Sequence, residues 1–206
     1  MSWRVGGLIG IALLALVGLA RLAQDADTGT ATWDASRASG FAGYLLLWAS
    51  VASGVLINLR FRPWGPMTWM IEVHRITSVL AASFLAAHVA GLLLDPVVEF
   101  NLVDGFVPFT STFRPIQVGM GTLAEWLTVI VLASTAFAGW LPYRLWKQVH
   151  MLSFPAFILA LLHGFTSGTD SGSTIAVGIY AATAGSLAGI FVLRLAGRGA
   201  LAAEAA

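Results

Sequence analysis

Residues 69–94 read WMIEVHRITSVLAASFLAAHVAGLLL. This stretch is long enough to cross a bilayer, because a spanning helix needs about 20 mostly apolar residues. It nevertheless contains two histidines, His74 and His88. Ionisable side chains inside a membrane are costly and usually mark function. The stretch therefore predicts a membrane fold and also indicates where the chemistry of the protein lies.

The composition of the whole chain supports a membrane protein. Of its 206 residues, 58% are hydrophobic and only 10% are charged, whereas soluble domains have about 25% charged residues. The formal net charge of +1 gives no electrostatic reason to expect nucleic-acid binding. The chain has no cysteine, which excludes disulfides, zinc–thiolate sites, cysteine-ligated iron–sulfur clusters and thiol catalysis.

Six apolar stretches are long enough to span a membrane, so we expect an all-α polytopic protein with a six-helix transmembrane bundle. The predicted spans are Val5–Leu22, Phe41–Leu59, Trp69–Leu94, Gly121–Trp140, Trp146–Phe165 and Thr174–Leu195. Residues 1–206 then form a single transmembrane domain, with no Gly-rich phosphate loop and no room for a soluble flavin or nucleotide domain. The first stretch has an alternative interpretation as a cleaved signal peptide, because Arg4 precedes it and small residues lie near its end.

The distribution of basic residues predicts the orientation of the bundle. Eight of them fall on one side, namely Arg4, Arg60, Arg62, Arg75, Arg144, Lys147, Arg194 and Arg198, and three on the other, namely Arg21, Arg37 and Arg114. Because cytoplasmic loops carry the excess of Lys and Arg, we expect both termini in the cytoplasm. The long connection Asp95–Gly119 then lies outside. The high ratio of Arg to Lys suggests a bacterial chain, so we expect a multi-pass protein of the bacterial inner membrane.

The four histidines form two pairs on the third and fifth predicted helices. His74 and His88 are 14 residues apart, or about 21 Å of helical rise, and His150 and His163 are 13 apart, or about 19.5 Å. Both helices run outward, so His74 lies level with His150 and His88 with His163. Two imidazoles hold a bare metal ion poorly. They complete a haem iron, because the porphyrin supplies the other four nitrogens.

The angular geometry leaves other interpretations open. In a straight helix His163 lies about 140° around the axis from His150. Pro155 lies between them and can kink the helix, which would bring both rings to one side. The histidines could instead form hydrogen bonds between helices, or line a pathway for a non-haem metal.

These residues resemble the ferric reductase-like transmembrane domain, which has His-x13-His on its third helix and His-x12-His on its fifth. The likeness covers about residues 41–195. Residues 144–154, RLWKQVHMLSF, are similar to the start of the fifth helix in bacterial members. Relatives include NADPH oxidases, ferric reductases and the haem-binding membrane subunit of periplasmic methionine sulfoxide reductase.

The resemblance implies two b-type haems stacked across the membrane, with iron ligated by His74 and His150 in one and by His88 and His163 in the other. Electrons would pass from a cytoplasmic or membrane donor to an acceptor outside. The NADPH oxidases and ferric reductases carry a flavin and NADPH domain after the sixth helix, whereas this chain ends soon after it. We therefore expect a separate donor, a flavin reductase or a quinol, and possible acceptors are ferric iron, oxygen or a periplasmic redox protein.

Three functional interpretations follow from the resemblance and from the way in which this chain differs from the NADPH oxidases and ferric reductases. The first is a haem-dependent transmembrane oxidoreductase, or its electron-transfer subunit. The second is a haem subunit that delivers quinol or flavin electrons to a periplasmic oxidoreductase. The third, of a different class, is a non-redox haem carrier or sensor, and a structural protein without cofactor is a further rival.

Two arginines are candidates for contact with the cofactor. Haem propionates are anionic and pair well with the forked donors of arginine. Arg75 adjoins a candidate ligand, and Arg114 lies in the outer connection, where it could hold a propionate, attract an anionic acceptor or be an ordinary solvated arginine. That connection is apolar and aromatic, so we expect it to fold back onto the outer haem and to form the acceptor or partner surface.

Overall fold

The computed structural model describes residues 31–204, apart from 62, 64, 97–98 and 169–170. The described part is helical, with no strand among these residues. The helices are α2 (Ala31–Asn58), α3 (Met67–Leu93), α4 (Leu102–Phe106), α5 (Pro115–Ala136), the 3-10 helix η1 (Ala138–Trp140), α6 (Tyr143–His150), α7 (Ser153–Ser167) and α8 (Thr174–Glu204). This confirms the all-α expectation for the described residues.

Five segments of the described chain are long and apolar enough to cross a membrane. They are Thr32–Asn58, Met67–Leu93, Pro115–Ala136, Tyr143–Ser167 and Thr174–Val192. They correspond to the second to sixth predicted spans, and they make this a membrane protein. The first predicted span, Val5–Leu22, lies outside the described residues, so a bundle of six spans stays a prediction.

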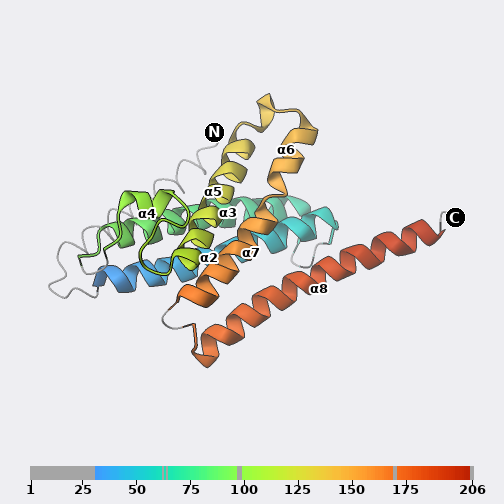
Figure 1. Cartoon of the computed structure of the whole chain (residues 1–206). Coiled ribbons are helices and arrows are strands. Elements are labelled where there is room, and N and C mark those ends of the chain that lie inside the picture. Colours follow the sequence, from blue (N-terminus) through green and yellow to red (C-terminus); the bar gives the residue numbers. More distant parts are fainter. Residues whose placement is uncertain (1–30, 62, 64, 97–98, 169–170, 205–206) are drawn as a thin grey trace.

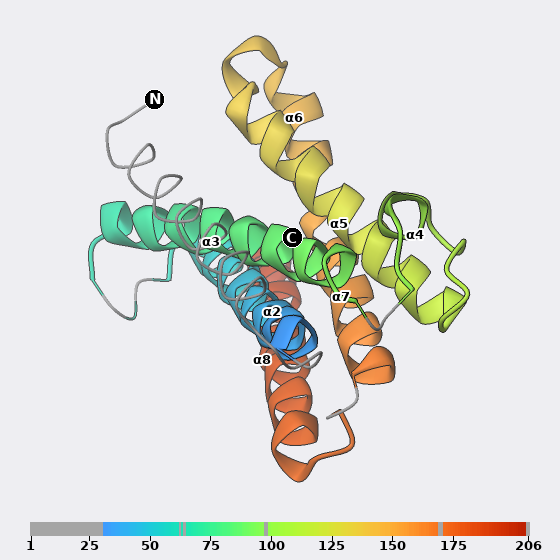
Figure 2. The same cartoon turned by 90° about the vertical axis from the view of Figure 1, so that its left-hand side faces the viewer.

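Two helical hairpins make the body of the protein. In one, α2 packs along the length of α3, and in the other α5 packs against α7. The second hairpin crosses the first, and the α5–α6 connection projects beyond it in both views (Figures 1 and 2). Helix α8 packs against α2 and α7, and its C-terminal part extends beyond the other helices (Figure 1). The histidine-bearing helices, α3 and α6–α7, therefore belong to different hairpins.

Helix α2 begins ten residues before the predicted span. The segment from Ala31 to Gly40 is too polar to look like a membrane helix, yet its hydroxyl side chains find partners on α3 and just after its end. The Thr32 hydroxyl donates to the Asp95 carboxylate at 2.8 Å, and the Ser36 hydroxyl donates to the His88 carbonyl at 2.9 Å. Because these polar groups are satisfied inside the protein, the helix extends past the apolar stretch.

The predicted loop Asp95–Gly119 is shorter than expected and contains the short helix α4. Asn101 caps α4 by accepting hydrogen bonds from two backbone N–H groups. Helix α5 begins at Pro115 rather than Gly121, because proline fits the first turn of a helix, where its missing N–H costs nothing. The predicted fourth span is also wrong at its other end, since regular helix stops at Ala136 and η1 follows.

The predicted fifth helix is two helices. Helix α6 ends at His150, and α7 begins at Ser153. Pro155 has no N–H to donate to the carbonyl of Met151, four residues earlier. That carbonyl instead accepts from the Phe154 N–H at 3.2 Å. The break therefore falls one turn before the proline, directly after a histidine.

A topology experiment tests the predicted orientation. Gly139→Cys lies between α5 and α6, where an added β-carbon meets no atom within 4 Å, and Thr112→Cys lies in the exposed connection before α5. In cells with a permeabilised outer membrane, we expect an impermeant maleimide to label T112C only, and to label both after lysis. Labelling of G139C alone before lysis would reverse the orientation, and labelling of both before lysis would mean that α5 does not span the membrane.

Candidate functional site

The four histidines face one another in two pairs. The rings of His74 on α3 and His150 on α6 have centres 6.0 Å apart, with an interplanar angle of 66°. The rings of His88 on α3 and His163 on α7 have centres 6.1 Å apart, with an angle of 71°. The break after His150 allows both rings of the α6–α7 segment to face α3. The structure thus brings together the residues that the helical rise places at equal depth.

The separation within each pair suits a shared metal. A metal–imidazole bond is about 2.0 Å long and a ring nitrogen lies about 1.1 Å from the ring centre, so two imidazoles on opposite sides of one metal have centres about 6.2 Å apart. Both observed separations are within about 0.2 Å of this value. The described residues contain no group of three or more His, Cys, Asp or Glu that could hold a metal. A metal held by either pair would therefore need further ligands from another group.

Hydrogen bonds fix the tautomer that three of these rings adopt in their neutral form. Nδ1 of His74 lies 2.8 Å from the Ser50 carbonyl oxygen, Nδ1 of His88 lies 2.8 Å from that of Ser36, and Nδ1 of His163 lies 2.8 Å from that of Gln117. A carbonyl can only accept, so each Nδ1 must carry the proton and donate it. Nε2 is then left with its lone pair, which is the form that ligates a metal.

Each of these carbonyls is accompanied by a glycine one turn further along the same helix. The three carbonyl–glycine pairs are Ser36 with Gly40, Ser50 with Gly54, and Gln117 with Gly121. An added β-carbon would lie 2.7 Å from His88 Nδ1 at Gly40, 3.2 Å from His74 Cε1 at Gly54, and 2.7 Å from His163 Nδ1 at Gly121. Glycine is thus what lets each ring approach closely enough to reach the carbonyl.

Sequence reasoning missed these positions, although a signal for two of them is present. Residues 36–40 read SRASG and residues 50–54 read SVASG, so the motif repeats after 14 residues. The two histidines on α3 are also 14 residues apart. An antiparallel helix with the same 14-residue spacing can therefore place a carbonyl and a glycine beside each ring. Two glycines that lie near the histidines in sequence do not contact the histidine rings. Gly91 lies against Ser36, and Gly164 lies against Tyr180.

His150 is the exception among the four. Among the described residues, three buried side-chain nitrogens have no hydrogen-bond partner: Nδ1 of His150, Nε1 of Trp146 and Nε of Arg75. The His150 ring stacks on Trp146 instead, with ring centres 5.0 Å apart and planes 25° apart. All three nitrogens belong to the His74–His150 pair or to a neighbour of it.

A cavity of about 530 Å³ lies at the other pair, His88 and His163. This volume is in the range of cofactor sites, which are mostly apolar with a few polar groups. The connection between α3 and α5 contributes Phe100, Gly105 and Phe113 to its wall. That connection therefore covers this cavity, as its apolar sequence predicts.

The two candidate arginines have different surroundings. Arg75 donates from Nη2 to the Glu72 carboxylate at 2.7 Å, and its Nε is one of the unpartnered nitrogens. Arg114 donates from Nη1 to the carbonyls of Thr166 and Ser167, at 2.9 and 3.3 Å, where α7 ends. The structure thus gives Arg114 a role in holding the end of the helix that carries His163. Contact of either arginine with a cofactor stays a prediction.

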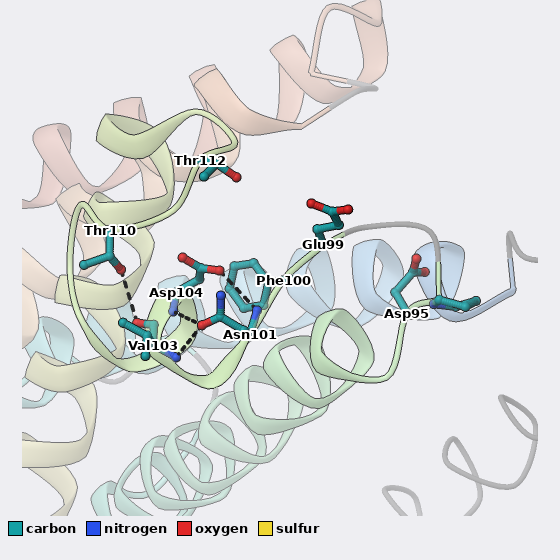
Figure 3. A pocket seen from close by; sticks show the side chains of 9 residues that line it. Asp95, Glu99, Phe100, Asn101, Val103, Asp104, Thr110 and Thr112 are labelled. Carbon is teal, nitrogen blue, oxygen red and sulfur yellow. Dashed lines mark hydrogen bonds between the residues drawn. The ribbon is translucent and has the colours of Figure 1, made fainter.

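A second, polar pocket of about 690 Å³ lies in the connection before α5, and the side chains of Asn101, Asp104 and Thr110 bond to the backbone of the same connection (Figure 3). The Asn101 N–H donates to the Asp104 carboxylate at 3.1 Å, and the Thr110 hydroxyl donates to the Val103 carbonyl at 3.3 Å. Asp95 accepts from Thr32. These bonds shape the loop, so the histidine pairs remain the candidate site.

The pairs fit haem better than a bare ion. Haem provides four equatorial nitrogens and needs two axial ligands, which is what each opposed pair offers. An anionic substituent of such a group would also satisfy the unpartnered Nε of Arg75. Fold and site together define an integral membrane protein with two opposed histidine pairs between its helical hairpins.

The chain belongs to the ferric reductase-like transmembrane family. A family model described as "Ferric reductase like transmembrane component" matches residues 39–161, which is more than half of the chain. The matched segment contains His74, His88 and His150 and ends two residues before His163. Comparisons with curated proteins and with solved structures gave no match.

The glycine contacts lead to a prediction about metal-site integrity. Gly40→Ala and Gly121→Ala should push His88 and His163 from their carbonyls. Loss of such an outer hydrogen bond typically lowers metal affinity about 10- to 100-fold. We expect a lower haem-to-protein ratio in purified G40A and G121A, measured by absorbance after extraction. Gly185→Ala is the matched control, since its β-carbon meets no atom within 4 Å, and equal loss in G185A would refute the explanation.

Arg114 leads to a prediction about stability. Arg114→Ala removes both bonds to the end of α7, and a charge at a helix C-terminus contributes about 1 kcal/mol. We expect a lower midpoint of thermal unfolding in detergent, with haem content retained. The exposed Arg144→Ala serves as the control. Unchanged unfolding combined with loss of haem would instead identify Arg114 as a cofactor contact.

Proposed function

We propose that the protein transfers electrons across the membrane through two b-type haems. One lies between His74 and His150, and the other lies between His88 and His163. The observation that carries this proposal is the pair of ring separations near 6 Å, with three of the four rings tied through Nδ1. Membership of the ferric reductase-like family supports transmembrane electron transfer as the function.

When bound, each haem supplies a reversible one-electron iron couple. The chain's own residues set the conditions for it. Carbonyls of α2 and α5 accept the Nδ1 protons of His74, His88 and His163, so Nε2 of each neutral ring would be free to bind the iron of a haem. Because these ring positions are fixed by rigid helices, little rearrangement is needed when the charge at the site changes.

The two proposed haem sites lie at different depths in the membrane. His74 and His88 are separated by about 21 Å of helical rise, and the hydrocarbon core is about 30 Å thick. Two haems held by these pairs would therefore lie toward opposite faces of the membrane. By the distribution of basic residues, the donor is cytoplasmic or membrane-borne, and the acceptor lies on the side of the α3–α5 connection. We propose a flavin reductase or a quinol as the donor.

Removing single ligands tests the assignment. Purified protein should hold two low-spin b haems in its reduced-minus-oxidised spectrum. We expect His88→Leu and His163→Leu to lose about half of the haem, and His74→Leu and His150→Leu to lose the other half. No haem after expression with adequate haem supply would refute the proposal.

Liposomes that contain the protein separate electron transfer from simple haem binding. With a reductant inside and an impermeant ferric acceptor outside, the parent should reduce the acceptor, and each ligand variant should not. A protein with two haems and no transfer above protein-free liposomes would favour a haem carrier or sensor.

A further inference from the structure

The four histidines are not held equally. His74, His88 and His163 each donate Nδ1–H to a helix carbonyl at 2.8 Å and lie against a glycine. In the described chain, His150 Nδ1 has no hydrogen-bond partner. It is the last residue of α6, and Met151 and Leu152 interrupt the helix directly after it.

Trp146 is the side chain that holds the His150 ring. It lies one turn earlier on α6, and the two rings stack with centres 5.0 Å apart and planes 25° apart. Tyr143 continues the stack on Trp146, with ring centres 5.8 Å apart. A stack limits tilting of the imidazole but does not fix its rotation or its protonated nitrogen, as a bond to Nδ1 does.

We infer that His150 is the exchangeable ligand of the protein, positioned by Trp146, and that its side of the His74–His150 centre binds a small neutral ligand such as carbon monoxide. This inference rests on the proposed function, because it presumes a haem between His74 and His150. In the exchange, the bond from His150 Nε2 to the ferrous iron breaks and a bond from the ligand's carbon forms. No electron is transferred. The His88–His163 centre, with both rings tied, does not exchange.

Carbon monoxide titration of the dithionite-reduced, full-length protein in detergent tests the inference. We expect one carbon monoxide bound per two haems. His150→Leu, which is expected to lose the haem between His74 and His150, should bind no carbon monoxide at its remaining haem. His163→Leu should bind one carbon monoxide per haem, because the haem that remains is the one between His74 and His150. These two variants assign the binding site without reference to activity.

Variants of the stacking residue test its positioning role. Trp146→Leu removes the stack, and we expect carbon monoxide affinity to rise about 2- to 10-fold. Trp146→Phe keeps an aromatic face and should stay near the parent. Trp140→Leu is the matched control, because Trp140 is 87% exposed on the neighbouring connection. Loss of one haem of two in W146L, restored in W146F, supports the same role.

Several outcomes would overturn the inference. Carbon monoxide binding to neither haem, to both equally, or only after His163 is replaced would show that His150 is not the weak ligand. Equal affinity in W146L and the parent would show that Trp146 does not position it. These outcomes differ from failure of the proposed function, which is the absence of two low-spin haems in the unmodified protein.

Discussion

The structure depends on which group accepts a hydrogen bond from the Nδ1 proton of each imidazole. A ring that binds metal through Nε2 must keep a proton on Nδ1, and in a membrane interior that proton needs an acceptor from the protein. Every helix offers many carbonyls, but each already accepts a hydrogen bond within the helix, and the side chains of the next turn shield it from a second donor. Glycine one turn further on opens the carbonyl to a second donor. Three of the four histidines use this arrangement.

This requirement explains the packing of the first hairpin. Helix α2 must place Ser36 and Ser50 opposite His88 and His74, so the two helices must run antiparallel with matched 14-residue spacings. Their close approach is supported at Gly91, where an added β-carbon would lie 2.9 Å from Ser36 Cβ. The polar start of α2 follows from the same need, since Ser36 also bonds to the His88 carbonyl. In the second hairpin, Gln117 and Gly121 on α5 serve His163 on α7.

The sequence alone predicted the helical class, five of the membrane helices and the pairing of histidines by depth. Those features follow from hydropathy and helical rise, which are local. It placed the start of α2 at Phe41 and that of α5 at Gly121, because polar residues and a proline-led first turn do not look like a membrane span. It missed Gly40, Gly54 and Gly121, because the reason for a glycine is a side chain on another helix. It identified Pro155 as a kink but could not place the break directly after His150.

A backbone carbonyl can accept the Nδ1 proton whichever side chain its residue has. The carbonyl belongs to serine twice and to glutamine once, so the residue that provides it is nearly free to vary, and only the glycine and the histidine are required. A site built in this way leaves a sparse signature: histidines at a fixed spacing, small residues on the facing helix, and little else. The family match fits this picture, since residues 39–161 include all three glycines and three of the histidines. Ligands of such a site can be found by spacing, whereas the groups that hold them become visible only when the helices are seen together.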